Sequence, residues 1–222
     1  MNDTATSSRR RLKEARPQQL LDAALELFVE KGFAATRAEE VAQRAGVSKG
    51  TLYLYYPSKE ELLKAVIREH LSARIAAGAA AAEKHRGPVA GLLREVFSRW
   101  WLEVFDSPTS GVFKLIISEV RNFPDIAEFY VAEVIRPAED LIGRIVQRGV
   151  DSGEFDALNV PDVVHSLCLP MVMLCVYKHS IGACSAAHHD HFEPHAFVRA
   201  HVDLIVRGLV RAKSAPRRAA AA

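Results

Sequence analysis

Apolar residues recur at helical spacing along most of the chain, and short polar breaks separate the runs. Gln18–Lys31 carries leucine, alanine and phenylalanine at intervals of three and four residues, the pattern of an amphipathic helix. No run alternates with the period of two that marks a half-buried strand. The pattern predicts an all-α fold of about nine helices, of which the longer ones after the first are Glu60–Lys84, Val89–Phe105, Gly111–Arg121, Ile126–Val150, Asn159–Ile181 and His195–Val210.

Two prolines lie inside these predicted helices. A proline has no N–H to bond the carbonyl four residues earlier, so Pro137 predicts a kink in Ile126–Val150, and Pro170 lies within Asn159–Ile181. The two ends of the chain are polar, basic or alanine-rich and are expected to be disordered. We expect four parts: an arm at 1–16, a first domain at 17–62, a larger helical domain at 63–212 and a tail at 213–222.

The most informative stretch is Thr36–Leu62. Thr36 and Glu39 have the spacing of a capping box, in which two side chains satisfy free backbone N–H groups at a helix start. Ser58 and Glu61 repeat that spacing, which predicts a second helix start nearby.

A tight turn and a short helix lie between these two starts. Gly46 suits the left-handed conformation that ends a helix, and Ser48 can cap a helix over Lys49–Tyr55. Pro57 ends that helix. Two short helices joined by a glycine-containing turn form a helix-turn-helix, whose second helix enters the DNA major groove.

At these residues the chain resembles the TetR/AcrR family of bacterial transcriptional regulators. The matching segments are V-A at 41–42, A-G-V-S at 45–48, G-T-L-Y-L-Y-Y at 50–56, Lys59 and Leu62, preceded by a helix that closes on Gly32-Phe33. The resemblance covers residues 17–64. Arg37 stands where the family usually has Ser or Thr, and Tyr56 replaces its common Phe.

The resemblance implies that Lys49–Tyr55 is the recognition helix. Tyr53 and Tyr55 match the family's phosphate-clamping aromatic residues, and Lys59 matches its phosphate contact. Lys49, Gly50 and Leu54 occupy positions expected to face base edges. The complete set expected at DNA is Thr36, Arg37, Ser48, Lys49, Gly50, Thr51, Tyr53, Leu54, Tyr55 and Lys59.

The remaining two-thirds of the chain carries no recognisable motif. By resemblance it should hold an effector pocket, which is mostly apolar with a few polar anchors. Each candidate could instead be ordinary core, because aromatic residues at helical spacing are more often core than ligand contacts. The pocket candidates are Phe97, Trp100, Trp101, Phe105, Phe113, Tyr130, His165, Met171, Met173 and Tyr177, with Glu119, Arg121 and Ser166 as further polar anchors.

Helix-turn-helix proteins usually dimerise to contact two half-sites. By resemblance the last two helices form the dimer surface, although the same residues could be buried within one chain. The candidates are Val163, Leu167, Leu174, Phe197, His201, Leu204, Ile205 and Leu209.

Composition limits the function only loosely. The 222 residues carry a net charge of +2, so DNA binding cannot rest on bulk charge. Local charge is more useful: Val41–Lys59 contains three cations and no acid, and residues 9–16 contain five cations against one acid. The segment 1–16 lacks the apolar core of a secretory signal. Cys168, Cys175 and Cys184 make no disulfide framework, which fits a reducing cytoplasm.

Three other functions are weaker. The histidines His188, His189, His191 and His195 match no named metal site, so no metal or cofactor is expected. His165 and Cys168 can meet on a helix as an enzyme pair, but no orienting group or oxyanion donor accompanies them. The apolar stretch Val160–Ile181 is interrupted by charged and histidine residues, so a membrane span is not expected.

The sequence therefore predicts a cytoplasmic, homodimeric DNA-binding regulator rather than an enzyme. Its partners would be a pseudo-palindromic double-stranded operator and a small, largely apolar or aromatic effector that releases it as a repressor. A constitutive or activating regulator without an effector is the alternative, and a helical enzyme using His165 and Cys168 is a remote one.

Overall fold

The computed structural model describes residues 3–156, 159–184 and 192–211 of the chain. π-Helical turns at Arg68–Ser72, Leu93–Phe97 and Val131–Ile135 join α4 to α5, α6 to α7 and α9 to α10. With those three pairs counted as continuous rods, the described residues form nine helices and the short α12, which confirms the all-α prediction. The helices are α1 (Asp3–Lys31), α2 (Ala38–Arg44), α3 (Lys49–Tyr55), α4 (Lys59–Ile67), α5 (Ala73–Lys84), α6 (Val89–Leu92), α7 (Ser98–Asp106), α8 (Ser110–Glu119), α9 (Pro124–Tyr130), α10 (Arg136–Asp151), α11 (Val160–Lys178), α12 (Ile181–Cys184) and α13 (Pro194–Leu209).

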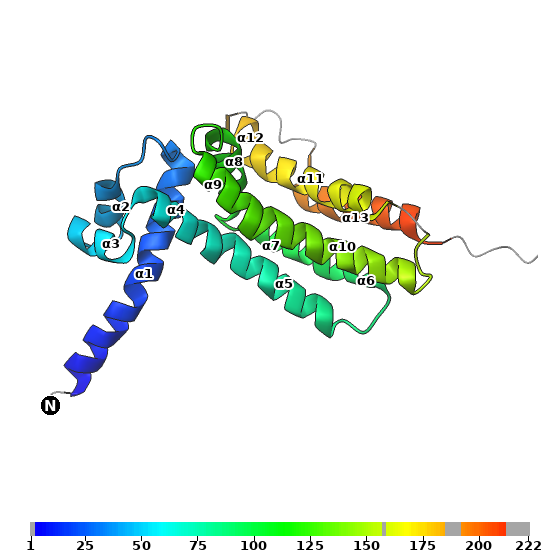
Figure 1. The fold of residues 1–222 in the computed structure, drawn as a ribbon, viewed down its shortest axis with the longest axis horizontal. Coiled ribbons are helices and arrows are strands. Elements are labelled where there is room, and N and C mark those ends of the chain that lie inside the picture. The colour runs from blue at the N-terminus through cyan, green and yellow to red at the C-terminus, as the bar shows by residue number, and fades with distance from the viewer. Residues whose placement is uncertain (1–2, 157–158, 185–191, 212–222) are drawn as a thin grey trace, which may run out of the picture.

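Helices α1 to α4 form a small head at one end of an elongated molecule (Figure 1). Phe28 of α1 and Phe33 after it are fully buried, with ring centroids 5.4 Å apart. Leu52 of α3 and Leu62 of α4 are equally buried. Each short helix therefore has one apolar face on a shared core, which fixes its direction relative to α1.

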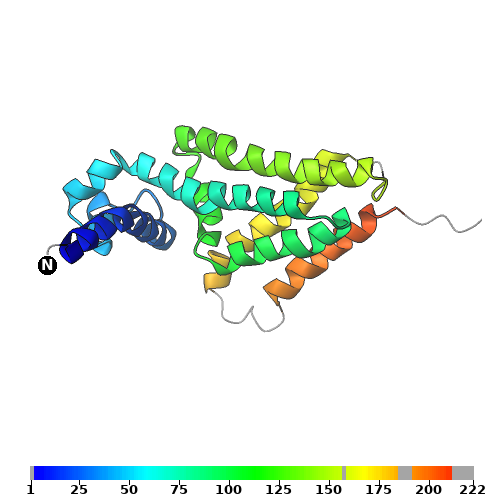
Figure 2. The ribbon, with the colours of Figure 1, turned by 90° about the horizontal axis from the view of Figure 1, so that it is seen from below.

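The other helices form a body in which long rods lie beside one another (Figure 2). The rod α4–α5 belongs to both parts, since α4 packs on α1 in the head and α5 contacts α10 in the body. Helix α8 also touches both parts, because it packs against α1 and against α11. These two elements link the head to the body, and α9 adds a third contact because it packs against α4.

Helices α9–α10 and α11 each continue through a proline. Pro137 leaves the carbonyl of Glu133 without its helical donor, and the Ser72 hydroxyl from the α4–α5 rod donates to that oxygen at 3.1 Å. The predicted kink at Pro137 is accompanied by the π-helical turn just before it.

The second proline is accommodated in the same way. Pro170 leaves the carbonyl of Ser166 without its helical donor, and His201 Nε2 of α13 donates to it at 2.9 Å. In both helices a neighbouring element supplies the missing donor, so the prolines fix how the rods are placed against each other.

Residues 3–16 differ from the expectation of a disordered arm, because they form the first part of α1. Arginine, lysine, glutamate, leucine and alanine dominate residues 9–16 and are good helix formers. Pro17 lies inside the helix and removes only one backbone hydrogen bond. The predicted tail at 213–222 lies outside the described residues.

One stretch, Val160–Cys184, is long and apolar enough to cross a membrane by length and composition. In the fold, α11 packs against α8, α10 and α13, and Leu167 and Met171 are buried there. A core helix of this kind passes the same test of length and hydropathy as a membrane span.

We predict a non-additive pair of substitutions at the first proline. Ser72→Ala should lower the free energy of unfolding by about 0.5–1.5 kcal/mol, because the Glu133 carbonyl loses its donor. In a Pro137→Ala background the new backbone N–H can bond to that carbonyl, so Ser72→Ala should cost much less. Urea unfolding at fixed protein concentration measures the cycle. Equal costs in both backgrounds would show that the hydroxyl does not replace the missing N–H.

Candidate nucleic-acid interface and internal cavity

Helix α3 is positioned by its capping residue and by the turn before it. Gly46 has a φ of 67°, and Val47 N–H donates to the Ala42 carbonyl at 2.9 Å, which closes α2. The Ser48 side chain accepts from the Thr51 N–H at 3.1 Å, so Ser48 caps α3 as the sequence predicts. Local chemistry alone therefore sets the turn between the two helices.

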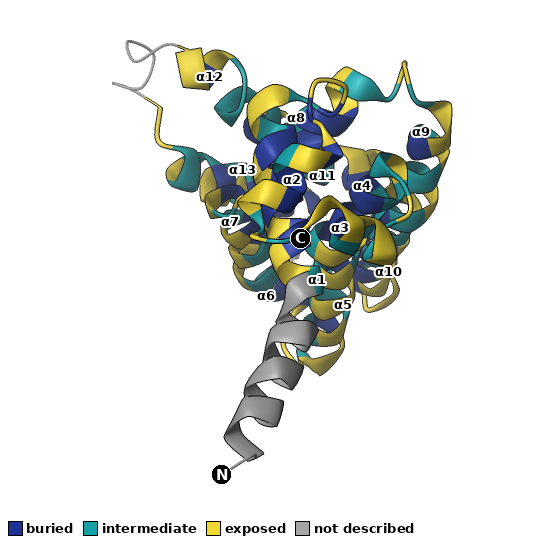
Figure 3. Cartoon of the chain, turned by 90° about the vertical axis from the view of Figure 1, so that its left-hand side faces the viewer, coloured by how far each residue is buried: buried dark blue, intermediate teal, exposed yellow. Residues whose placement is uncertain are grey.

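The outer face of α3 is open to solvent. Leu54 is 80% exposed and Tyr53 is also exposed, whereas Leu52 is fully buried. Seen from the head end, α3 and α2 carry exposed residues on their outer surfaces (Figure 3). A leucine and a tyrosine are thus exposed to water side by side on a helix of seven residues. Adjacent apolar side chains left in water are unfavourable, and such a patch is a common sign of a binding surface.

Lys49 lies on the same face and is held by neighbours. Its ammonium pairs with Glu39 of α2 and lies 5.7 Å from the Tyr53 ring centroid. The hydrogen bond from Lys49 lowers the pKa of Glu39, and the same contact raises the pKa of Lys49. Both side chains are exposed, so a stronger anion could displace Glu39 at little cost.

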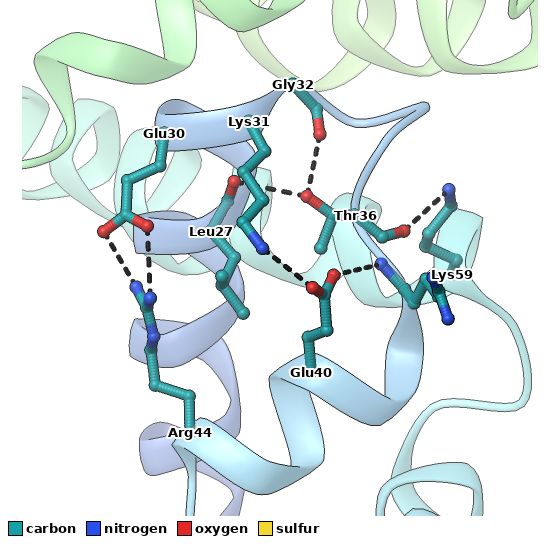
Figure 4. Close-up of polar contacts among 9 residues, drawn as sticks. Leu27, Glu30, Lys31, Gly32, Thr36, Glu40, Arg44 and Lys59 are labelled. Atoms are coloured by element: carbon teal, nitrogen blue, oxygen red, sulfur yellow. Dashed lines mark hydrogen bonds and ion pairs between the residues drawn. The ribbon is translucent and has the colours of Figure 1, made fainter.

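Thr36 does not take the role that the sequence predicts. It is 1% exposed, and its hydroxyl lies 2.8 Å from the Gly32 carbonyl and 3.2 Å from the Leu27 carbonyl at the end of α1. The predicted Thr36–Glu39 capping box is therefore wrong by one residue. Arg37 is the N-cap of α2, and its N–H donates to Glu40 at 3.0 Å (Figure 4).

Arg37 is the freer of the two predicted contacts at this helix start. Its side chain is exposed, and none of the described residues forms an ion pair with it. The buried Thr36 hydroxyl is not available to DNA in this arrangement, whereas the Arg37 guanidinium is.

Lys59 also has a different role. Its ammonium donates to the backbone carbonyls of Phe33 at 2.8 Å, Ala34 at 3.2 Å and Thr36 at 3.1 Å. It lies 4.5 Å from the Phe33 ring centroid. Three carbonyls account for all three N–H donors of an ammonium. Lys59 therefore binds α4 to the loop after α1 and has no donor left for a phosphate.

Two further ion pairs join the helices of the head (Figure 4). Arg44 of α2 makes a two-pronged contact with Glu30 of α1, at 2.8 and 3.1 Å. Lys31 pairs with Glu40 at 2.7 Å. The pKa values of Glu30 and Glu40 lie below the usual range because of these hydrogen bonds. Of the three cations in Val41–Lys59, Arg44 and Lys49 are therefore paired with carboxylates within the head.

The body contains a cavity of about 460 Å³ between α5, α7, α8, α10 and α11. This volume is in the range of ligand pockets, roughly 300–1,000 Å³. A smaller apolar cavity of about 70 Å³ shares Trp100 and Trp101 with it and includes Phe97. Of the predicted pocket residues, the larger cavity brings together Trp100, Trp101, Phe113, Tyr130 and His165.

Four of the predicted pocket residues lie elsewhere. Phe105 packs against His195 and Lys178, and Met171 is buried in the core. Met173 points outward, because two residues along a helix turn a side chain by about 200°. Tyr177 contacts Phe192. These four predictions gain no support from the cavity, because composition cannot say which face of a helix meets it.

Of the four proposed polar anchors, only one lies at the cavity. Arg121 and Ser166 are exposed and do not line the cavity, and Glu119 contacts the head instead. His165 lines the cavity and lies 3.3 Å from Glu139, another lining residue. The sequence therefore identified one of these four anchors at the cavity.

Two polar groups at the cavity lack hydrogen-bond partners among the described residues, and one of them, on Trp101, is buried. The Trp101 indole N–H is buried without an acceptor, and no hydrogen bond is formed by the Tyr130 hydroxyl. Trp100 differs, since its N–H donates to the Arg74 carbonyl at 2.9 Å. An unpaired buried donor costs about 1–3 kcal/mol, and an effector with an acceptor atom could recover part of that cost.

The cysteine in this cavity is poorly suited to nucleophilic chemistry. Burial raises the pKa of Cys168 to about 12, so the reactive thiolate is scarce at neutral pH. His165 is next to Glu139 rather than paired with the thiol. The pairing of His165 with Cys168 as an enzyme site finds no support in this geometry.

Comparison with known proteins now adds to this geometry. Residues 20–66 match the model of bacterial regulatory proteins of the tetR family. The transcriptional regulator RutR of Escherichia coli K12 is 47% identical over 66 residues, or 30% of this chain and 31% of RutR. The head therefore carries the sequence pattern of the tetR family. The transcriptional activator FasR of Mycolicibacterium smegmatis is 48% identical over 59 residues, 27% of each protein.

These alignments span less than a third of the length of either curated relative. Comparison with solved structures covers most of the chain, including the body. FadR of Bacillus subtilis, solved in complex with stearoyl-CoA, has a TM-score of 0.68 and 21% identity, covering 86% of this chain and 98% of FadR. This match shows a shared fold. The relatives are regulators, which agrees with the expectation that this chain is not an enzyme.

The outer face of α11 and α13 contains some of the predicted dimer residues. Leu204 is 68% exposed, and Phe197, His201 and Ile205 are half-buried. The other four predicted residues are buried within one chain, so they do not form a surface: Val163, Leu167, Leu174 and Leu209. Leu169 and Met173 are exposed on the same side of α11 as Ser166 and were missed.

The histidine-rich segment lies partly outside the described residues. His188, His189 and His191 lie outside the described residues. His195 is described, and its Nε2 lies 2.8 Å from an Asp106 carboxylate oxygen. That contact ties α13 to the end of α7.

The sequence does not reveal contacts between residues that are far apart along the chain. Glu119 accepts from the Phe33 N–H at 3.2 Å across 86 positions of sequence, and no local pattern announces such a contact. The only available signal was that Glu119 is an acid at the end of an apolar helix.

We predict that Lys59→Ala lowers the stability of the tetR-family head. Loss of the ammonium removes the donor of three backbone carbonyls, which should lower the free energy of unfolding by about 1–3 kcal/mol. Lys49→Ala is the matched control, because that side chain is exposed and should change stability by less than about 0.5 kcal/mol. Urea unfolding followed by circular dichroism measures both. A Lys59→Ala protein as stable as Lys49→Ala would return Lys59 to the role of a phosphate contact.

Proposed function

We propose that this protein is a sequence-specific DNA-binding transcriptional regulator whose body binds a largely apolar effector. The proposal rests on the exposure of the outer face of α3, where Leu54 is 80% exposed. The helix itself is held in place by its Ser48 cap and by the buried Leu52. The match of residues 20–66 to the tetR-family model supports the proposal, because α3 is the second of the two short helices and would be the recognition helix of a helix-turn-helix.

In the proposed complex, α3 enters the major groove of double-stranded DNA. Tyr53 and Tyr55 would contact phosphates, with Ser48 and Thr51 at the helix start. Lys49, Gly50 and Leu54 would face base edges. Arg37 would contact the adjacent backbone, and the structure removes Thr36 and Lys59 from direct contact because both are engaged within the head.

A homodimer would present two such helices to a pseudo-palindromic operator. The exposed apolar residues of α11 and α13, Leu169, Met173 and Leu204, supply a surface that a second copy can cover. Dimer symmetry would then match the symmetry of the two half-sites.

The chemistry of the cavity suggests the class of effector. Its walls are apolar, and the exposed residues Ile117, Ile135 and Leu169 lie on its rim. Tyr130, Trp101 and His165 provide a few polar groups. FadR, which shares the fold, binds stearoyl-CoA. We propose a long-chain acyl compound, with its apolar chain against Trp100 and Trp101.

Binding of that effector would release the protein from its operator, as in a repressor. The cavity is lined by Leu71 and Ile75 of the rod that also carries α4, so an occupied cavity can move α4 and with it the head. Such a switch requires that the effector bind the two arrangements unequally. The relative FasR is named an activator, so activation is the second candidate for the same site. The free cysteines fit a cytoplasmic protein.

For DNA binding we predict different effects for two exposed side chains. Tyr53→Ala should weaken operator and non-specific DNA alike, because phosphate contacts position the protein without selecting sequence. Lys49→Ala should reduce discrimination as well as affinity, by about 1–3 kcal/mol at the base that it contacts. Gel-shift titrations over a range of salt, with a duplex selected from a random pool, measure both. If Lys49→Ala loses affinity equally for all sequences, Lys49 contacts a phosphate.

For effector binding we predict a change in intrinsic fluorescence. Trp100 and Trp101 are the only two tryptophans of the chain, and both line the cavity. Long-chain fatty acids and their coenzyme A thioesters should therefore change the emission saturably. Ala138→Phe, which fills the cavity, should abolish the change, and Leu54→Ala on α3 is the control that should keep it. Binding by Ala138→Phe at wild-type affinity would place the ligand elsewhere.

A further inference from the structure

Helix α8 has one face on the cavity and the opposite face on the head. Phe113, Ile116 and Ile117 line the cavity. Gly111, on the opposite side of the helix by its periodicity, touches the head, and so does Glu119, which lies at the edge of the cavity face, three residues after Ile116. The cavity and the DNA-binding head therefore share a wall that is one helix thick.

On the side that faces the head, α8 is tightly packed against α1. A Cβ atom built on Gly111 would lie 2.5 Å from Val29 Cγ2 of α1, so the two helices are in direct contact there. Near Glu119 the fit is also close, since a Cβ on Gly32 would lie 3.1 Å from Glu119 Oε1. Close-packed elements transmit a displacement, because no void absorbs it.

The backbone of Phe33 is the point where the two parts of the molecule meet. Its N–H donates to Glu119 of the body at 3.2 Å, and its carbonyl accepts from Lys59 of the head at 2.8 Å. The Phe33 ring is fully buried and packs edge-on against Phe123 at 4.8 Å between centroids. Movement of Glu119 must therefore either move the peptide group that carries the Phe33 N–H or break the hydrogen bond to that N–H.

We propose that Glu119 is a positioning residue through which α8 reports the occupancy of the cavity to the DNA-binding head. This inference rests on the proposed function and adds a second route to the one along the α4–α5 rod. An effector pressing on Phe113 and Ile116 would displace α8 toward α1. Glu119 would carry that displacement to Phe33, and Lys59 would pass it from the Phe33 carbonyl to α4.

The first experiment measures the contact itself, without DNA or effector. Protein labelled with ¹⁵N-phenylalanine gives one amide signal for each of the ten phenylalanines, Phe33 included. The probe of occupancy is Val164→Phe, which fills the cavity from α11 and leaves α8 unaltered. It should shift the Phe33 amide resonance in otherwise wild-type protein and in Glu119→Gln, whose amide oxygen still accepts. The shift should be lost in Glu119→Ala.

The second experiment measures the coupling to DNA. Val164→Phe should change the affinity for a selected duplex by about fivefold or more in the wild-type and Glu119→Gln backgrounds, and by less than about twofold in Glu119→Ala. Glu128→Gln is the control, since Glu128 is an exposed acid of α9 without a polar partner in the part of the chain that the structure describes. It should behave as wild type. Thermal unfolding of each variant confirms that it is folded.

The outcomes separate this inference from the proposed function. Equal effects of Val164→Phe in all backgrounds would mean that occupancy reaches the head along the rod alone, and the inference would be overturned. A Phe33 resonance that does not respond to Val164→Phe would overturn it as well. Wild-type protein that binds no DNA would refute the proposed function, and the amide shifts would still decide whether Glu119 connects the cavity to the head.

Discussion

The loop between α1 and α2 cannot satisfy its own backbone, and the placement of the head depends on how that problem is solved. Residues 32–36 leave a helix through Gly32, whose φ is 85°, and expose peptide groups that have no helical partner. The Thr36 hydroxyl donates to the Gly32 carbonyl, and Lys59 donates to three more carbonyls. Glu119 accepts from the Phe33 N–H. Each of these groups would cost about 1–3 kcal/mol if it were buried without a partner.

The same requirement orders the body. A proline inside a helix leaves one carbonyl without a donor, and here each such carbonyl meets a side chain from another helix. Ser72 on the α4–α5 rod donates to the Glu133 carbonyl, and His201 on α13 donates to the Ser166 carbonyl. A hydrogen bond of this kind is directional, since it weakens steeply when the donor–hydrogen–acceptor angle falls below about 120°. The prolines therefore give the rods a defined register in addition to their apolar contacts.

The features that could be predicted from sequence are those whose causes lie within a few residues. Ser48, Gly46 and the bounds of α3 follow from local capping and turn chemistry, and the structure confirms them. The role of Lys59 depends on a loop 23 to 26 positions away, and that of Glu119 on one 86 positions away. The sequence contains the donor and the acceptor but not their distance.

The cavity shows the same limit in another form. Aromatic content predicted a pocket between the middle helices, and Trp100, Trp101 and Tyr130 line one. Met171 and Met173 have similar chemistry and lie two positions apart, yet one is buried in the core and the other is exposed. The face of α11 that each occupies depends on where α8, α10 and α13 pack, and this is a property of the assembled body.

The electrostatics of the head bear on how the proposed DNA complex would form. In the free protein, Lys49 is paired with Glu39 and Arg44 with Glu30, so the cations near α3 are already compensated. A base edge that accepts from Lys49 must first displace Glu39, and both partners are exposed enough for the exchange to cost little. The gain then comes mainly from released counterions and from the aromatic and hydroxyl groups at the helix. A net charge of only +2 is compatible with such a complex, because cations that are paired within the free protein can exchange their carboxylate partners for DNA on contact.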